Sequence, residues 1–233
     1  MKPLVILRPE PGAGRTAARA EALGLSPLRV PLFEAEPLPW QAPPAGQFDA
    51  LLVTSAQTAR LANLRAYRAL PAYAVGEATA DALRQAGFPR VTAGDGDGSA
   101  IAARIVGDGH DRVLHLAGES VAPIEGRPLR IMRIPVYRMR PTGAAALEES
   151  LPDVAVLLVH SPRAGARLAT LVPEAARMGK HIVAISPAAL AACGGGWASA
   201  VSAERPADDR MLALAARLCE GLSPYGGHAT DAR

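Results

Sequence analysis

The stretch LLVTSAQTARLA (Leu51–Ala62) recurs later in the chain as LLVHSPRAGARLA (Leu157–Ala169). Each copy joins a short apolar run, typical of a buried strand, to a serine and then to an arginine-bearing helix. Repeats constrain an architecture more strongly than any single motif, because similar segments form similar structural units. The two copies therefore predict that the chain contains one kind of unit twice.

Further segments match in the same order. AVGEATADALRQAGFPRVTA (Ala74–Ala93) corresponds to AISPAALAACGGGWASAVSA (Ala184–Ala203), and helical segments rich in alanine and leucine follow at Ser99–Gly107 and Asp208–Gly221. Each half thus has the order strand, helix, strand, helix, strand, helix. Strands that alternate with helices predict parallel sheets with right-handed crossovers. We expect a mixed α/β fold built from two similar units.

The N-terminal segment supplies the opening elements of one unit. Pro3–Leu7 is an apolar strand, Arg15–Leu25 an amphipathic helix and Leu28–Glu34 a second strand; the proline-rich Pro37–Gln47 then breaks any regular pattern. The second repeat lacks such an opening, so we expect the N-terminal segment to complete it. The expected organisation is a discontinuous domain of residues 1–33 and 142–222, an inserted domain of residues 37–135, linker strands at 34–36 and 136–141, and a disordered tail at 223–233.

The composition is typical of a cytosolic protein with buried cores. Of 233 residues, 49% are hydrophobic and 20% are charged. No apolar run approaches the roughly 20 residues that cross a membrane, and the N-terminal run is too short for a signal peptide. Cys193 and Cys219 have neither CxxC nor metal-binding spacing. We therefore expect reduced thiols, a cytoplasmic location and no membrane partner.

Charge and aromatic content argue against a nucleic-acid partner. The net charge is only +3, which is too small to favour a nucleic acid. Aromatic residues make up 4% of the chain, which leaves few side chains for stacking on nucleobases. The five histidines show no metal-ligand spacing, and no serine lies in a nucleophile-elbow context. The basic residues are nearly all arginines, which fits a small polyanionic ligand and equally fits GC-rich codon usage.

The segment PGAGRTA matches a dinucleotide-binding fingerprint, with Gly12 and Gly14 in the glycine positions and Glu34 further on. The fingerprint needs a tight turn directly after the strand, whereas Arg8, Pro9, Glu10 and Pro11 intervene here. The two prolines also remove backbone donors that a phosphate would need. The motif is thus a weak indication of nucleotide binding.

Polar and small residues follow the expected parallel strands, at the edge where ligands bind in open α/β sheets. They are Thr54, Ser55, Gly76, Thr79, Ser161, Arg163 and Ser186. Serine and threonine at these places also cap helices without any ligand. Both interpretations can hold together, because N–H groups at a helix start can bind carboxylates or phosphates. Tyr137, on the return crossing between the domains, is either a packing residue or a hydrogen-bond donor to a ligand.

These segments together resemble the uroporphyrinogen-III synthase family. The resemblance runs from Leu4 to about Gly221 and lies in the order and spacing of six segments rather than in one specific motif. They are ILRPEPGAGRTAARAEALGLSPLRVPLFE, FDALLVTSAQTAR, AVGEATADALRQAGF, VYRMRP, LLVHSPRAGARL and AISPAALAACG. The resemblance implies two flavodoxin-like, parallel-sheet, three-layer domains joined by a two-stranded linker, with the active site between them.

The family's activity is implied in the same way. Its members, enzymes of the lyase class, close the linear tetrapyrrole hydroxymethylbilane to uroporphyrinogen III in haem biosynthesis, without a cofactor. The terminal hydroxyl leaves as water to give an azafulvene cation, and the last pyrrole ring is inverted through a spirocyclic pyrrolenine. The uncatalysed closure does not invert the ring, so the enzyme must above all orient the reacting ends, an effect worth about 7–11 kcal/mol at best.

The resemblance also implies site residues. Tyr137 matches a cleft tyrosine that would assist departure of the hydroxyl, and Arg8 and Arg163 are candidates for contacts with substrate carboxylates. The positions that would face the substrate are Thr54, Ser55, Gly76, Thr79, Ser161 and Ser186. The sequence departs from the family pattern at Ser186-Pro187-Ala188-Ala189, where Gly-Pro-x-Thr is usual. It departs again at His160, where an aromatic residue or threonine is common.

The sequence is also compatible with two other classes of protein. One is a non-catalytic two-domain module that binds a carboxylated pyrrole or another anion. The other is a nucleotide-dependent enzyme that uses Gly12 and Gly14. If the chain is instead an enzyme like the members of the family named above, acting on a small polycarboxylate, we expect a monomer with no cofactor and no metal.

Overall fold

The computed structural model describes residues 1–95, 98–121, 123–124 and 128–223. Apart from Ser223, the expected disordered tail lies outside the described residues. The chain divides into two compact units, which we call the first unit (Met1–Glu34 and Pro141–Arg233) and the second unit (Ala35–Arg140). No helix of the described chain is long and apolar enough to cross a membrane.

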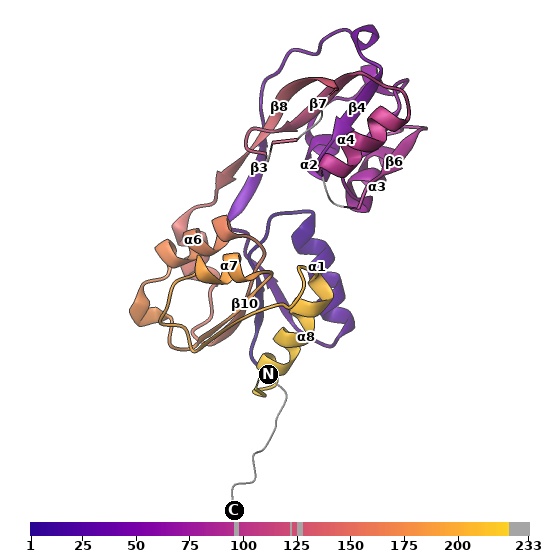
Figure 1. The fold of residues 1–233 in the computed structure, drawn as a ribbon. Coiled ribbons are helices and arrows are strands. Elements are labelled where there is room, and N and C mark those ends of the chain that lie inside the picture. Colours follow the sequence, from indigo (N-terminus) through magenta and orange to yellow (C-terminus); the bar gives the residue numbers. More distant parts are fainter. Residues whose placement is uncertain (96–97, 122, 125–127, 224–233) are drawn as a thin grey trace, which may run out of the picture. The chain divides into compact units, whose positions relative to one another are not determined.

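The first unit contains a five-stranded, fully parallel sheet. Its strands, in spatial order, are β2 (Pro27–Arg29), β1 (Leu4–Ile6), β9 (Ala155–Val159), β10 (Lys180–Ala184) and β11 (Ser199–Ser202). Its helices are α1 (Gly12–Ala22), α5 (Ala144–Ser150), α6 (Pro162–Leu171), the short 3-10 helix η3 (Glu174–Ala176), α7 (Pro187–Ala191) and α8 (Asp208–Cys219). Helices α1 and α8 cover one face of the sheet, and α6 and α7 lie on the other (Figure 1).

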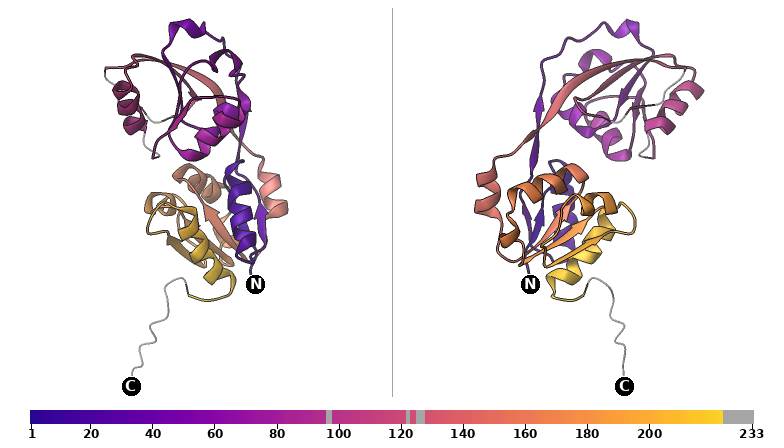
Figure 2. Two further views of the ribbon diagram at one scale, coloured as in Figure 1. Left: turned by 90° about the vertical axis from the view of Figure 1, so that its right-hand side faces the viewer. Right: turned by 60° about the vertical axis from the view of Figure 1, so that its left-hand side comes forward.

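The second unit contains a six-stranded sheet. In spatial order its strands are β3 (Phe33–Pro37), β8 (Arg130–Pro141), β7 (Arg112–Gly118), β4 (Ala50–Val53), β5 (Ala72–Ala74) and β6 (Val91–Ala93). From β8 to β6 every neighbouring pair is parallel. Its helices are η1 (Ala45–Gln47), α2 (Ala56–Leu61), η2 (Arg65–Tyr67), α3 (Glu77–Gln85) and α4 (Gly98–Gly107). Figure 2 shows the helices of each unit packed around its sheet.

The expected mixed α/β class with parallel sheets is confirmed, and the repeated segments occupy equivalent positions. Strands β4, β5 and β6 follow one another across one sheet as β9, β10 and β11 do across the other. Strand β7 lies beside β4 as β1 lies beside β9, so a strand from elsewhere in the chain completes each repeat.

Burial on both faces explains why the central strands are continuous apolar runs. Leu4–Ile6, Leu51–Val53 and Ala155–Val159 are fully buried, as parallel strands with helices on each side must be. Burying each large aliphatic side chain contributes about 1.5–3 kcal/mol relative to leaving it in water. Most polar side chains therefore lie near the ends of these strands, where the loops begin.

The prediction of a single strand at Leu28–Glu34 is wrong. The structure has two strands there, β2 in the first sheet and β3 in the second. Pro31 lies between them and has no N–H to donate to a ladder, which accounts for the interruption. The expected linker strands at residues 34–36 and 136–141 belong to longer strands, β3 and β8, at one edge of the six-stranded sheet.

The close packing of α6 against α7 predicts that a larger residue at their contact destabilises the first unit. A Cβ at Gly165 would lie 2.7 Å from the carbonyl oxygen of Ala189 and 3.1 Å from Cys193 Sγ. Gly165→Ala should push the two helices apart and lower the free energy of unfolding by about 1–3 kcal/mol, measured by urea denaturation.

Gly107→Ala is the matched control, since Gly107 ends α4 and no described atom lies within 4 Å of its Cβ position. This change should alter stability by less than about 0.5 kcal/mol or be slightly stabilising. Equal effects of the two substitutions would contradict the packing argument.

Candidate functional site

The carboxyl edge of the first sheet has one point where the strand order reverses. From β1 the chain proceeds to β2 on one side, and from β9 it proceeds to β10 on the other. The loops after β1 and β9 therefore diverge, and a divergence of this kind marks the usual ligand position in such sheets. Arg8 follows β1, and His160 and Ser161 follow β9.

The second sheet has the same reversal between β7 and β4. From β4 the chain proceeds outward to β5 and β6, then crosses to β7 and β8 on the other side. Thr54 and Ser55 follow β4, and Gly118 ends β7. Each unit thus brings its own subset of the expected site residues to a place suited to ligand binding.

Three of the expected serines cap helices. Ser55 Oγ accepts from Gln57 N at 3.2 Å, Ser161 Oγ from Ala164 N at 3.1 Å, and Ser186 Oγ from Ala189 N at 3.2 Å. The capping interpretation is correct for these oxygens. A hydroxyl that accepts one hydrogen bond still has its own proton to donate, so capping leaves each serine able to bind a carboxylate.

Gly76 and Thr79 lie at the start of α3. Gly76 is the extended residue before the helix, with no side chain to cap it, whereas Thr79 is buried. Backbone N–H groups, rather than side chains, are what this junction offers to a ligand.

Tyr137 lies at the carboxyl edge of the second sheet, beside the last residue of β7. The β7–β8 ladder pairs Ala117 with Pro135 and then Gly118 with Tyr137, so one residue of β8 is bulged out. Pro135 has no N–H for the ladder, and bulges of this kind redirect side chains. Tyr137 is 7% exposed, and its hydroxyl makes no hydrogen bond to any residue that the structure describes.

Gly118 is what allows the ring of Tyr137 to lie where it does. A Cβ at residue 118 would be 2.9 Å from Cζ and 3.0 Å from the hydroxyl oxygen of Tyr137. Any larger residue there would displace the phenol. Sequence reasoning singled out Tyr137 but not Gly118, because nothing in the local pattern pairs the two.

Thr54 has a partner that the sequence did not indicate. Its Oγ1 lies 3.3 Å from Nε2 of His115, a residue of β7 that is almost fully buried. Burial, with a smaller contribution from the charge of Arg133, lowers the pKa of His115 to about 4. The imidazole is therefore neutral near pH 7 and serves as a hydrogen-bond partner rather than a charge.

Arg8 belongs to a charged cluster in the first unit, which we call the Asp208 cluster. It consists of Arg8, Thr16, Arg19, His160 and Asp208. Arg8 Nη1 lies 3.2 Å from Asp208 Oδ1, and His160 Nε2 lies 2.9 Å from the same oxygen. Thr16 donates to Asp208 Oδ2 at 2.7 Å, and Arg19 Nη1 lies 3.4 Å from Oδ2.

The cluster was missed because Asp208 looks like an ordinary acidic residue in the first turn of α8. Burial alone would raise its pKa, but hydrogen bonds from His160 and Thr16 and the charge of Arg8 outweigh this and lower it to about 2. Burial lowers the pKa of His160 despite the opposing effect of Asp208. Asp208 is thus ionised and His160 neutral at physiological pH.

Arg163 lies over an aromatic ring. Its guanidinium carbon is 4.5 Å from the centroid of Phe33, and that of Arg167 is 5.7 Å from the same centroid. Cation–π contacts of this kind are worth about 0.5–1 kcal/mol at exposed sites. They hold Arg163 near the start of α6, the position from which a carboxylate contact was expected.

The glycine-rich segment is arranged differently from a dinucleotide site. Gly14 N, at the start of α1, donates to Glu10 Oε2 at 2.9 Å, and Glu10 Oε1 accepts from Arg29 at 2.8 Å. A carboxylate of the protein itself thus occupies a donor that a phosphate would need. This disfavours the nucleotide interpretation.

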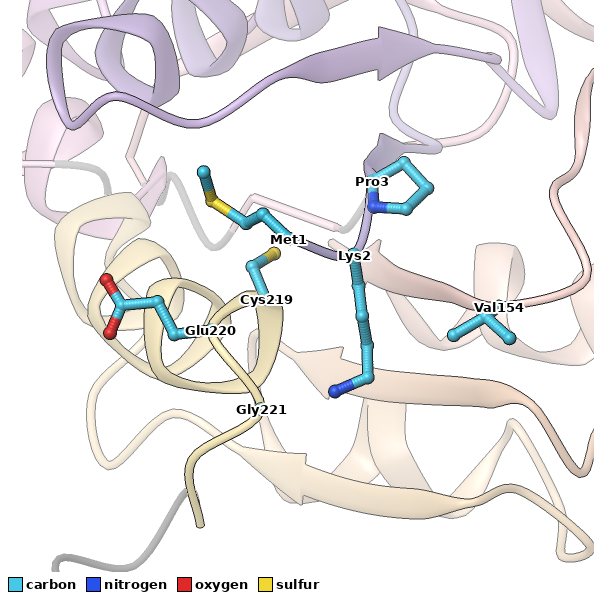
Figure 3. Close-up of a pocket in the computed structure, with 7 residues that line it drawn as sticks. All are labelled: Met1, Lys2, Pro3, Val154, Cys219, Glu220 and Gly221. Atoms are coloured by element: carbon cyan, nitrogen blue, oxygen red, sulfur yellow. The ribbon is translucent and has the colours of Figure 1, made fainter.

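The cavities that the structure describes do not coincide with the carboxyl edge of the first sheet. One, of about 400 Å³, lies between the start of β1 and the end of α8, near Lys2, Val154 and Cys219 (Figure 3), and contains none of the expected site residues. The other, of about 330 Å³, is lined by His115 and Arg133 together with four apolar residues. No group of three potential metal ligands occurs among the described residues.

Fold and edges together define an α/β protein of the class that binds ligands beyond the carboxyl ends of parallel strands. The sequence profile of the family described as uroporphyrinogen-III synthase HemD matches residues 14–213. The chain belongs to this family, whose members are lyases of tetrapyrrole biosynthesis.

Solved structures agree with the fold. Uroporphyrinogen-III synthetase from Helicobacter pylori aligns with a TM-score of 0.66 at 17% identity, covering 94% of this chain and 100% of that one. A mutant uroporphyrinogen III synthase from Thermus thermophilus aligns with a TM-score of 0.50 at 20% identity, covering 94% and 99%. Identities this low show similarity of fold alone. Among curated proteins, none matches the sequence.

The buried His115 predicts how stability depends on pH. Its folded-state pKa of about 4 lies below the ordinary value of 6.5, so the unfolded chain binds this proton more readily. Its contribution is complete above pH 6.5 and falls as the pH drops towards 4, by up to about 3 kcal/mol. His115→Gln, which does not titrate, should therefore show a smaller loss of unfolding free energy between pH 7 and 4.5.

Urea denaturation of both proteins at the two pH values measures this difference. Part of the fall should remain in the variant, because burial also lowers the pKa of His160. An identical fall in both proteins would show that His115 is not buried in its neutral form.

Proposed function

We propose that this chain is a uroporphyrinogen-III synthase that closes hydroxymethylbilane with inversion of the terminal pyrrole ring, without a cofactor. Family membership supports the proposal, and so does the position of Tyr137. Its hydroxyl has no protein partner among the described residues and lies at the carboxyl edge of β7. Thr54 and Ser55 follow the neighbouring strand β4, where part of a ligand can lie within reach of the phenol.

The strand orders support the family's implied architecture. In the first unit the order β2-β1-β9-β10-β11 corresponds to the flavodoxin-like order. In the second unit β8-β7-β4-β5-β6 gives the same order if β7 is counted as the first strand. We therefore describe the units as two flavodoxin-like domains, the second permuted.

The chemistry we assign to Tyr137 is proton donation. As the terminal C–O bond of the substrate breaks, the phenol proton passes to the departing oxygen, so that water leaves and an azafulvene cation forms. The last pyrrole ring attacks this cation, and ring inversion proceeds through the spirocyclic pyrrolenine. The proton lost when the closed macrocycle regains its aromatic pyrroles restores the phenol.

The capping serines and the N–H groups beside them are assigned to the substrate's eight carboxylates. Ser161 and Ser186 in the first unit, and Ser55 and Gly76 in the second, lie at strand-to-helix junctions. Hydrogen bonds to ionised groups are worth about 1.5–3 kcal/mol each. Several such contacts can fix the two ends of a flexible chain, which is what ring inversion requires.

We also propose a monomeric enzyme in the cytoplasm. The cysteines Cys193 and Cys219 are free and buried, and burial raises the pKa of Cys193 to about 11. Unreactive thiols of this kind are typical of reducing compartments.

Isomer analysis tests the activity directly. The protein should convert enzymatically prepared hydroxymethylbilane to uroporphyrinogen III, identified by chromatography after oxidation to the porphyrin. Spontaneous closure gives the type I isomer, so a mixture without protein is the control. Formation of the type I isomer alone, together with tight porphyrin binding, would support the non-catalytic binding module instead.

Tyr137→Phe tests the proposed proton donor. Removing the hydroxyl should lower kcat about 10- to 100-fold with KM little changed, at the low end of general acid catalysis because water can partly substitute. Thr79→Val should cost less, since backbone donors at that junction remain.

Tyr67→Phe is the matched control in the same unit, because its hydroxyl donates to the carbonyl of Pro43 at 2.8 Å. This variant should lose stability and keep kcat. An unaltered kcat in Tyr137→Phe would reduce Tyr137 to a packing residue.

A further inference from the structure

The Asp208 cluster joins parts of the first unit that are distant in sequence. Asp208 begins α8, Arg8 follows β1, Thr16 and Arg19 belong to α1, and His160 follows β9. Arg8 and Asp208 are 200 residues apart in the chain. All these groups meet where the strand order of the first sheet reverses.

Exposure divides the cluster into a buried part and an accessible part. The side chains of Asp208 and His160 are 10% and 6% exposed, whereas that of Arg8 is 29% exposed. The hydrogen bonds of Arg8 to other described residues come from Nη1 alone, to Asp208 and Thr16. Since a guanidinium has five N–H donors, most of its donors are left for another group.

The charges of the cluster do not cancel. Among the described residues, Asp208 is the acidic group that attracts Arg8, while Arg15 and Arg19 repel it. With His160 neutral, the cluster carries a surplus of positive charge among the described residues. A carboxylate of a ligand would complement this surplus and accept two parallel hydrogen bonds from the guanidinium.

Gly12 has a role here that its glycine motif did not suggest. A Cβ at residue 12 would lie 2.4 Å from Nε and 2.9 Å from Nη2 of Arg8. The guanidinium thus has Asp208 at Nη1 and the bare backbone of Gly12 beside Nε and Nη2. The glycine makes space for an arginine rather than for a phosphate.

We propose that Arg8 binds a carboxylate of the substrate, and that Asp208 and Gly12 are positioning residues that hold its guanidinium for this contact. The proposal rests on the proposed function for the identity of the substrate, a linear tetrapyrrole polycarboxylate. His160 and Thr16 act through Asp208, because each fixes one of its two oxygens.

Steady-state kinetics with hydroxymethylbilane provide the first test. Arg8→Ala should raise KM about 10- to 150-fold, as expected for loss of one charge-assisted contact, with kcat within about twofold. Asp208→Asn should raise KM in the same direction. In the Arg8→Ala background, Asp208→Asn should add less than about twofold, because its effect passes through Arg8.

A pair of glycine variants separates positioning from folding. Gly12→Ala removes no charge but displaces the guanidinium, so it should raise KM as Arg8→Ala does and have no further effect when Arg8 is already alanine. Gly14→Ala is the matched control in the same turn of α1, because its Cβ would meet Glu10 at 3.1 Å and not Arg8. This control should keep the KM of the wild-type protein.

Binding of uroporphyrin III, the stable octacarboxylate obtained by oxidising the product, provides a readout that does not need turnover. Fluorescence titration should show weaker binding by Arg8→Ala and Gly12→Ala, and unchanged binding by Gly14→Ala. If the wild-type protein forms no uroporphyrinogen III, the proposed function fails while this comparison still tests Arg8. Unchanged KM and porphyrin affinity in Arg8→Ala, or additive effects of Arg8→Ala and Asp208→Asn, would overturn the inference.

Discussion

The pairing of β1 with β9 is the constraint on which the first unit depends. Leu4, Val5 and Ile6 align with Val156, Leu157 and Leu158, and all six are fully buried. Without this ladder the N-terminal strand would have only β2 beside it, and helices α1 and α8 would share no sheet to cover. The same pairing produces the reversal of strand order, since β1 leads to one side and β9 to the other.

In both sheets, burial decides where chemistry is possible. Central strands covered on two faces hold few polar side chains, such as His115 in β7, so most polar residues gather where the strands end. Those at the carboxyl ends precede helices whose first N–H groups have no partner within the helix. This explains why serines that cap helices and residues suited to binding carboxylates are the same residues here.

Local pattern predicted the strands of the repeat, the helices between them and the capping serines, because each of these depends on neighbours a few residues away. The break at Pro31 could have been predicted from its missing N–H. The contacts of Arg8 with Asp208 and of Thr54 with His115 could not, since they depend on which strands lie side by side. The bulge that brings Tyr137 onto Gly118 likewise depends on the register of two strands.

The discontinuity of the first unit has a consequence for how the protein emerges from the ribosome. The second unit, Ala35–Arg140, is a single uninterrupted segment, whereas the first needs residues from both ends of the chain. The N-terminal strand and helix must therefore wait, with their apolar faces uncovered, until β9 to α8 have been synthesised. The second unit can meanwhile fold and bring the two segments of the first unit closer together. This reduces the chain entropy that is lost when those two segments finally pair.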